Sequence, residues 1–252
     1  MGREMRHGLI RRLQREVPRG APIDLSTLAA VGVSQQAASQ YVKRGWLLRL
    51  GQGVYAFPGD EWTAPGAIKL LQRRVQGLHV GGKSALAMQG VRHNLASRER
   101  LTLWGDVRFA VPEWFSSRYP ARYVSAALFD WPNEELRSQT LTTPPSVTPG
   151  LLVSTPERAA LEMLYDVGTE ESLEETRNVF EGLRNLRVEV TGQLLSCCTS
   201  VKAVRLFLTW ARETSLLDVD AIYDRFRPRV GSDRRWISRL ADGTLLTLKS
   251  RG

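Results

Sequence analysis

The sequence is poor in the side chains that disulfides and metal sites require. Its 252 residues include two cysteines, the neighbours Cys197 and Cys198, and three histidines. Adjacent cysteines form a disulfide only with strain, and they lack the C-x-x-C spacing of zinc and redox sites. The scattered histidines pair with no cysteine or acid at metal-ligand spacing. We therefore expect no disulfide, no metal and no cofactor, which fits a reducing cytoplasmic compartment.

Long apolar runs and catalytic motifs are also missing. No run of about 18 apolar residues is available to span a membrane, and Met1–His7 contains no apolar signal-peptide core. No G-x-S-x-G sequence marks a nucleophilic serine. The acids of residues 170–175 fall on a helical surface rather than around a metal. These absences predict a cytoplasmic protein that is not an enzyme and has no membrane partner.

What the sequence does have is an unevenly placed positive charge, with a formal total of +9. Residues 1–57 hold nine Lys/Arg against three Asp/Glu, residues 58–150 hold eleven against eight, and residues 151–252 hold fifteen of each. The surplus therefore lies in the N-terminal region, where it would attract a polyanion such as DNA. A basic face that only improves solubility is the alternative that charge alone leaves open.

The N-terminal region has the pattern of three short helices. Apolar residues recur at every fourth position over Glu4–Val17, which predicts the first helix. Asp24 is the predicted N-cap of a short second helix, and Gly32 supplies the turn that follows it. Ser34 is the predicted N-cap of a third helix over residues 35–45.

A β-hairpin is predicted directly after the third helix. Two β-prone runs, residues 46–50 and 54–57, flank the glycine-rich tip Gly51-Gln52-Gly53. Helix, turn, helix and hairpin in this order are typical of a winged helix-turn-helix, which we expect over residues 1–58.

The third helix is predicted to expose a polar face that suits the major groove of DNA. Glutamine can pair bidentately with adenine, whereas lysine and arginine can hold phosphates. The predicted DNA contacts are Ser34, Gln35, Gln36, Ser39, Gln40, Lys43 and Arg44 at this helix, with Arg49 and Gln52 on the wing. Additional DNA or partner contacts are predicted from the first helix at Arg11, Arg12 and Arg15. The alternative is a three-helix module that binds protein instead.

Residues 77–84 match the phosphate-binding pattern G-x-x-x-x-G-K-[ST] letter for letter. Such a loop must follow a buried strand and open a helix. Residues 65–76 instead have the spacing of an amphipathic helix, and the helix expected over residues 85–89 is short. We expect a coincidental match, and keep a nucleotide-binding enzyme that uses Lys83 and Ser84 as an alternative.

The rest of the chain is predicted to mix strands and helices. Short strands are expected at residues 101–104, 108–111 and 123–129. A stretch rich in Thr, Ser and Pro at residues 140–150 predicts a loop or a sub-boundary. Thr155 is the predicted N-cap of the helix that follows.

Later segments complete this part of the chain. Ser172 is the predicted N-cap of a helix over residues 172–186. The Asp-Gly pair within residues 241–243 predicts a closing hairpin between residues 236–240 and 244–248.

A further predicted helix carries three basic residues on one flank, Lys202, Arg205 and Arg212, opposite an apolar face. One interpretation is an ordinary solvated flank, and the other is a contact to DNA or to a partner protein. The spacing alone leaves both open.

Three segments of the chain resemble the AbiEi family, the antitoxins of AbiE-type (type IV) toxin–antitoxin systems. Val80–Gly90 is similar to the family element G-G-x-[ST]-A-L-x-x-x-G. Ser154–Glu162 and Val201–Leu208 are similar to two later segments, and all three follow an N-terminal winged helix in the family's order. The resemblance covers nearly the whole chain.

The resemblance implies an autorepressor that binds repeats in its own promoter through the winged helix. It also implies an antitoxin that counteracts a nucleotidyltransferase-type toxin, so the expected partners are double-stranded DNA and that toxin. We expect an α+β chain, with the winged helix followed by a larger mixed α/β, mainly helical domain over residues 63–252, and a monomer that binds DNA cooperatively. Residues 228–236 match the family's basic tail only loosely, so a stand-alone regulator without a toxin is the alternative.

Overall fold

A computed structural model of the chain describes residues 11–17, 19–91, 100–145, 148–239, 243 and 245–249. Helices and strands are mixed along the chain, which places it in the α+β class. The predicted start of the first helix, residues 4–10, lies outside the described residues, as does most of the predicted turn at 241–243. The described part of the first helix covers residues 11–16.

The other helices range from short turns to a rod of thirteen residues. They are α2 (Leu25–Ala30), α3 (Gln35–Lys43), α4 (Ala64–Arg74), α5 (Gly82–Met88), α6 (Glu113–Ser116), α7 (Glu134–Gln139), α8 (Pro156–Tyr165), α9 (Leu173–Glu181), α10 (Val188–Cys197), α11 (Val201–Glu213) and α12 (Val219–Phe226).

The strands are short and belong to three separate sheets. They are β1 (Ile23–Asp24), β2 (Leu48–Gly51), β3 (Val54–Ala56), β4 (His79–Val80), β5 (Leu101–Gly105), β6 (Ala121–Ser125), β7 (Leu141–Thr142), β8 (Val153–Ser154), β9 (Trp236–Arg239) and β10 (Leu245–Leu248).

The N-terminal region, residues 11–57, is built from locally capped helices. The Asp24 carboxylate accepts a hydrogen bond from the Thr27 amide at 2.8 Å and begins α2, as predicted. Gly32 has φ +86°, which a residue with a side chain rarely adopts. Ser34 begins α3, but this helix ends at Lys43 rather than at residue 45, because Gly45, at φ +71°, turns the chain away.

Strand β3 separates two hydrophobic cores. It pairs with both β1 and β2, and its side chains alternate between opposite faces. Tyr55, and Phe57 just beyond the strand, join the core of the N-terminal region, whereas Val54 and Ala56 join the larger core of the remaining chain. The predicted hairpin is therefore present, but it is packed on two sides rather than projecting freely.

A five-stranded mixed sheet forms the centre of the larger region, with the strand order β6-β5-β4-β8-β7. The pairs β4–β8 and β5–β6 are parallel, and the pairs β4–β5 and β7–β8 are antiparallel. The segment predicted as a loop or sub-boundary, residues 140–150, contains β7 and most of its connection to β8. It joins neighbouring strands of one sheet, so it is a loop within the fold.

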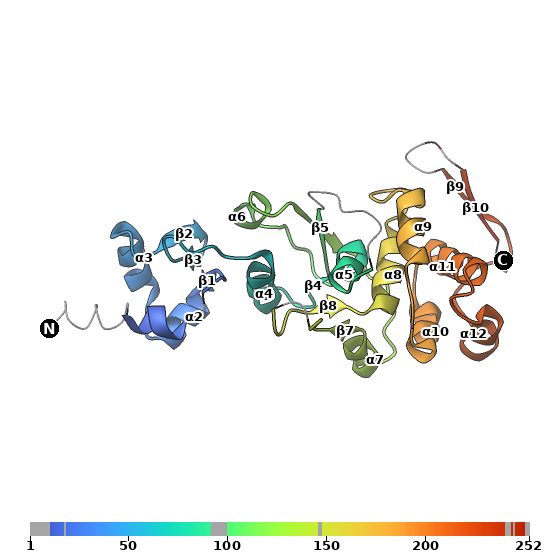
Figure 1. The fold of residues 1–252 in the computed structure, drawn as a ribbon, viewed down its shortest axis with the longest axis horizontal. Helices are drawn as coiled ribbons and strands as arrows, with labels where there is room; N and C mark the ends of the chain where they lie inside the picture. Colours follow the sequence, from blue (N-terminus) through green and yellow to red (C-terminus); the bar gives the residue numbers. More distant parts are fainter. Residues whose placement is uncertain are drawn as a thin grey trace.

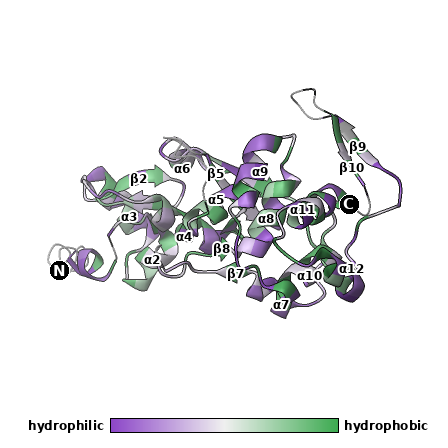
Figure 2. Cartoon of the chain, turned by 45° about the vertical axis from the view of Figure 1, so that its right-hand side comes forward, coloured by the Kyte–Doolittle hydropathy of each residue, from purple (hydrophilic) through white to green (hydrophobic). Residues whose placement is uncertain are grey.

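Helices cover this sheet and continue beyond it. Helix α8 packs against α5 and α11, and Glu157–Leu164 is buried along its whole length. Figure 1 shows the N-terminal region at one end of the molecule and α10–α12 with the β9–β10 hairpin at the other. Figure 2 shows the same order after a 45° rotation.

Two predicted strands and one helix need correction. Residues 108–111 form no strand, and β6 covers 121–125 instead of 123–129. The reason is pairing, because β5 offers partners to β6 only from Leu101 to Gly105. The helix predicted over 172–186 ends at Glu181. No helix in the part of the chain that the structure describes has the length and apolar character to cross a membrane.

Candidate nucleic-acid interface

The polar face of α3 is exposed to solvent, opposite the buried Ala38 and Tyr41. Its exposed members are Ser34, Gln35, Gln36, Ser39, Gln40, Lys43 and Arg44. Ser34 Oγ accepts from the Ala37 amide at 3.2 Å, and Ser39 Oγ donates to the Gln35 carbonyl at 3.1 Å.

Three side chains of this face are free to bind another molecule. Gln36, Gln40 and Lys43 form no side-chain hydrogen bond or ion pair with any residue that the structure describes. An amide side chain offers two donors and two acceptor sites, and an ammonium group offers three donors. This part of α3 therefore presents a row of unused hydrogen-bonding groups.

Arg44 is held in place at the C-terminal end of the same helix. Its guanidinium carbon lies 5.3 Å from the centre of the Trp46 ring, a cation–π distance. The Trp46 ring lies 5.4 Å from that of Tyr41, which belongs to the N-terminal core. The stack orients one positive charge beside the exposed face of α3.

The hairpin carries the two predicted wing residues, Arg49 and Gln52, and both are exposed. Its other side is fixed to the larger region. Arg74 of α4 donates to the Gly53 carbonyl at 2.7 Å. A Cβ on Gly51 would approach the Trp114 ring to 2.7 Å, so only glycine fits against that indole. Contacts from α4 and α6 therefore set the position of the hairpin relative to α3.

The predicted arginines of the first helix differ in their freedom. Arg12 pairs with Glu16 at 3.0 Å, and Arg15 pairs with the same carboxylate at 3.2 Å. These hydrogen bonds lower the pKa of Glu16, and the bond from Arg12 has the largest effect. Arg11 is exposed and forms no ion pair among the described residues. All three remain accessible, because the pairs lie on the surface.

The structure corrects the expectation for two basic residues of α11. Arg205 is 2% exposed, and its guanidinium donates to the carbonyls of Val230, Ser232, Arg234 and Leu248. The Lys202 ammonium donates to the carbonyls of Tyr165 and Val167, each at 2.7 Å. Neither side chain extends into solvent as a free charge, because backbone carbonyls accept from two N–H groups of Lys202 and four of Arg205.

Arg212, the third predicted residue of that helix, does lie on the surface. It forms a bidentate pair with Asp220 of α12 at 2.7 and 3.1 Å. This pairing raises the pKa of Arg212. Of the three basic residues, Arg212 alone keeps an accessible charge.

Residues 77–84 do not have the geometry of a phosphate-binding loop. His79 and Val80 pair in the central sheet instead of curving around an anion. Lys83 is bound by Glu175 at 2.8 Å and Glu171 at 3.4 Å. Ser84 Oγ accepts from the Thr102 amide at 2.9 Å and is buried.

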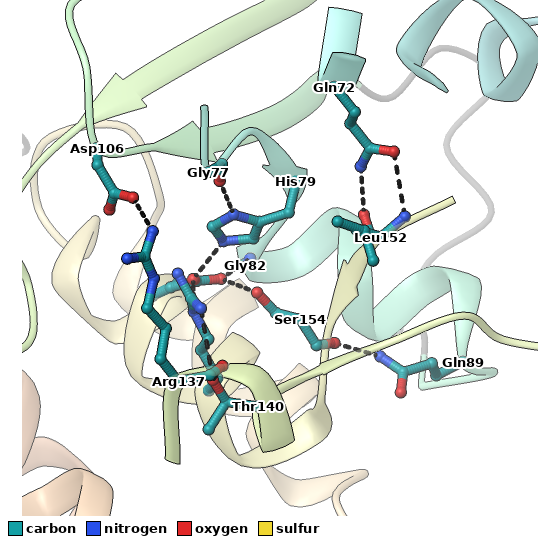
Figure 3. Close-up of polar contacts among 12 residues, drawn as sticks. Gln72, Gly77, His79, Gly82, Gln89, Asp106, Arg137, Thr140, Leu152 and Ser154 are labelled. Atoms are coloured by element: carbon teal, nitrogen blue, oxygen red, sulfur yellow. Dashed lines mark hydrogen bonds and ion pairs between the residues drawn. The ribbon is translucent and has the colours of Figure 1, made fainter. Parts of the chain in front are cut away.

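The same segment takes part in a buried polar cluster centred on Glu162, of which Figure 3 labels His79, Gly82 and Ser154. The carboxylate accepts from the Arg158 Nε at 2.7 Å, the Ser154 Oγ at 2.8 Å and the Gly82 amide at 2.9 Å, and lies 3.0 Å from the His79 Nε2. Burial acts to raise the pKa of Glu162, but Arg158 and His79 outweigh it and lower that pKa to about 2.

The contacts of His79 indicate that both of its ring nitrogens carry a proton. Its Nδ1 lies 2.7 Å from the Gly77 carbonyl, so that nitrogen donates. Although burial lowers the pKa of His79, an unprotonated Nε2 would direct its lone pair at the Glu162 carboxylate. We therefore assign this proton to Nε2, since the lowered pKa of Glu162 keeps the carboxylate ionised. With both ring nitrogens of His79 protonated, Glu162, His79 and Arg158 together carry one net positive charge.

The cluster explains why two segments of the sequence stand out. A Cβ on Gly81 would lie 2.4 Å from Glu162 Oε2, and Gly82 has φ +53°. The glycine pair therefore lets the N-terminus of α5 approach a carboxylate on α8. Sequence reasoning missed Glu162 and Arg158; the signal was an arginine and a glutamate four residues apart in a helix whose one other charged residue is Glu157.

Family models and a solved structure match the chain. Residues 98–249 match the family described as "Transcriptional regulator, AbiEi antitoxin, Type IV TA system", and residues 6–97 match its N-terminal domain. No curated protein sequence matches the chain. The crystal structure of the RV2827C protein from Mycobacterium tuberculosis has a similar fold, with a TM-score of 0.56, 17% identity, and coverage of 93% of this chain and 87% of that one. The chain belongs to the AbiEi antitoxin family of transcriptional regulators.

Proposed function

We propose that residues 1–58 form a winged helix-turn-helix that binds the promoter of the protein's own operon and represses it. The observation that carries the proposal is the exposed face of α3, where Gln36, Gln40 and Lys43 have no partner among the described residues. The positive surplus of residues 1–57 supports it, since phosphate neutralisation supplies much of the affinity for DNA.

The proposed docking places α3 in the major groove. Gln36 and Gln40, with Gln35 and Ser39 beside them, would contact base edges, because amide side chains can read adenine. Lys43, Arg44, Arg49 and Gln52 would contact the backbone and fix the register. Arg11, Arg12 and Arg15 would extend the basic surface, and monomers would bind adjacent repeats cooperatively.

We further propose that residues 63–252 counteract a toxin of the nucleotidyltransferase type in the cytoplasm. Family membership supports this role, because the family description names a type IV antitoxin. In this role the chain itself would catalyse no reaction. A regulator without a toxin is the second candidate, favoured by the loose match of residues 228–236 to the family's basic tail.

The test of DNA binding is an anisotropy titration of the full chain against its own upstream DNA, with scrambled DNA as competitor. We expect specific binding that weakens as salt rises. The double variant Gln36→Ala/Gln40→Ala should lose the preference for the promoter, and the control Gln193→Ala, an exposed glutamine of α10, should keep it. Equal affinity for promoter and scrambled DNA would refute a sequence-specific repressor.

The toxin is tested separately by co-expression. Growth arrest caused by a nucleotidyltransferase gene adjacent to this one should be relieved by the full chain. Relief should persist in the Gln36→Ala/Gln40→Ala variant, because that variant changes only the DNA surface. Failure to relieve arrest, together with intact promoter binding, would favour the stand-alone regulator.

A further inference from the structure

A cavity of about 310 Å³ lies beside the buried polar cluster, and aromatic side chains form much of its wall. Trp104 comes from β5, and Phe129 and Trp131 come from the segment after β6. The rings of Phe129 and Trp131 lie 4.8 Å apart at an angle of 38°. Flat apolar faces of this kind favour a planar ring over a branched aliphatic group.

Arg158 supplies a hydrogen-bond donor at this wall, where its guanidinium carbon lies 5.1 Å from the centre of the Trp131 ring and 5.7 Å from that of the Phe129 ring. Its Nε donates to Glu162, and its Nη1 lies 3.4 Å from the Thr140 hydroxyl. The remaining nitrogen, Nη2, bonds to no residue that the structure describes, although Arg158 is only 5% exposed and lines the cavity. Because Arg158 lines the cavity, Nη2 can donate to an oxygen placed there, and a hydrogen bond between a guanidinium and a carboxylate is a strong one.

Charge favours a negative ligand. His79 also lines the cavity, and the trio of His79, Arg158 and Glu162 carries one net positive charge. The remaining charged residues of the lining, Arg137 and Asp106, form an ion pair and cancel each other (Figure 3). One positive charge therefore remains to be balanced.

We propose that this cavity binds a planar aromatic or heteroaromatic carboxylate of one or two rings, with the carboxylate on Arg158 Nη2 and the ring against Trp104, Phe129 and Trp131. The volume is near the lower end of ligand pockets, which begin at about 300 Å³, and therefore suits a small molecule. The proposal is independent of DNA binding, since none of the cavity residues lies in the N-terminal region.

Isothermal titration of the full chain tests the chemical class of the ligand. The probe is indole-3-carboxylate, with indole as the neutral ring and cyclohexanecarboxylate as the anion that lacks an aromatic ring. We expect saturable binding of the probe with a Kd below about 1 mM, and affinity at least about tenfold weaker for both comparators. Equal binding of indole would refute the role of Arg158, and absence of saturable binding by the probe would refute the site.

A pair of variants tests the location. Ala127 is an exposed residue of the cavity lining, so Ala127→Trp should fill the mouth without disturbing the core. Ala221→Trp makes the same change at an exposed position of α12, away from the cavity. The first variant should weaken the probe at least about tenfold, and the second should leave it unchanged. Undiminished binding by Ala127→Trp would place the probe elsewhere and overturn the proposal.

Discussion

Helices α3 and α11 are both amphipathic and both carry basic residues, yet the two helices use those residues in opposite ways. In α3 the exposed Lys43 forms no ion pair with the described residues, and Arg44 at its C-cap stacks on Trp46 in full view of solvent. In α11 Lys202 and Arg205 donate to six backbone carbonyls of their own chain. The position of a basic residue on a helix therefore does not determine whether its side chain is free to bind a ligand or is bonded within the fold.

Whether a basic side chain is used by the fold depends on whether carbonyl oxygens near it lack a hydrogen-bond donor. Residues 228–235 form no helix or strand, so their carbonyls need donors from elsewhere. Arg205 lies beneath this segment and presents five N–H groups in a fixed fork. Helix α3 lies at the edge of the molecule beside a hairpin whose strands β2 and β3 pair with each other and whose Gly53 carbonyl accepts from Arg74 of α4. Its basic side chains consequently extend into solvent.

The largest change in stability is expected at Arg205, the buried arginine of α11. Arg205→Ala removes donors from four carbonyls, three of them in the irregular segment, and should lower the free energy of unfolding by at least about 3 kcal/mol. Urea unfolding, followed by far-UV circular dichroism, measures it. Folded Arg205→Ala protein should still bind the promoter normally. A wild-type unfolding midpoint would mean that Arg205 is not structural after all.

The next effect distinguishes two buried arginines by their acceptors. Arg158 faces a carboxylate that titrates, whereas Arg205 faces carbonyls that do not. Glu162 has a folded pKa of about 2, below its ordinary value of 4.5, so its contribution to stability is present above pH 4.5 and is lost as pH falls toward 2.

Glu162→Gln should therefore flatten part of the decline in stability between about pH 4.5 and 2, while lowering stability at neutral pH. Unfolding midpoints measured across that range provide the comparison. The matched variant Glu174→Gln, at an exposed position of α9, should keep the wild-type profile. If the unfolding midpoint of Glu162→Gln fell with acid as steeply as that of the wild type, the buried cluster would not control stability at low pH.

A smaller effect concerns sequence reading by α3. Gln36→Ala and Gln40→Ala should each reduce the preference for promoter over scrambled DNA by about 1–3 kcal/mol for each base that the glutamine reads. Their stability should remain that of the wild type, because neither side chain forms a hydrogen bond or ion pair with another described residue. A weaker affinity for both DNAs alike would mean that these glutamines bind the DNA backbone rather than the bases.

The comparison also shows where sequence reasoning succeeds. The caps Asp24, Ser34 and Ser172 were predictable, because a cap bonds to an amide three residues away. Asn133, the N-cap of helix α7, forms the same bond, accepting from the Leu136 amide at 2.8 Å. Helix α10 begins at Arg187 without a side-chain cap and carried no such signal.

Contacts between residues that are distant in the sequence could not be predicted from it. Glu162 meets Gly82 across 80 positions, and Arg205 meets its carbonyls across 25 to 43. Periodicity predicts which face of a helix is polar, but it does not identify what that face will meet. The free face of α3 and the occupied flank of α11 therefore looked alike in the sequence.

A finer effect separates charge from base reading within α3. Lys43→Ala should weaken promoter and scrambled DNA equally and reduce the slope of log affinity against log salt by about 0.9, the value for one phosphate contact. Anisotropy titrations at several salt concentrations measure the slope. An unchanged slope would place Lys43 away from the backbone. Lys69→Ala, which removes a lysine bonded to the Pro149 carbonyl, serves as the control.

The smallest change in stability and in DNA affinity is expected at Arg212, which shares features with both the α3 and the α11 residues. It belongs to α11, yet its side chain is exposed and pairs with Asp220. Exposed pairs contribute little to stability because solvent screens them, so Arg212→Ala should unfold at the wild-type midpoint. It should also bind the promoter normally, because the Asp220 carboxylate already neutralises the charge that a phosphate would need. Reduced promoter affinity in Arg212→Ala, with its midpoint unchanged, would extend the DNA-binding surface to α11 and break the division between the two helices.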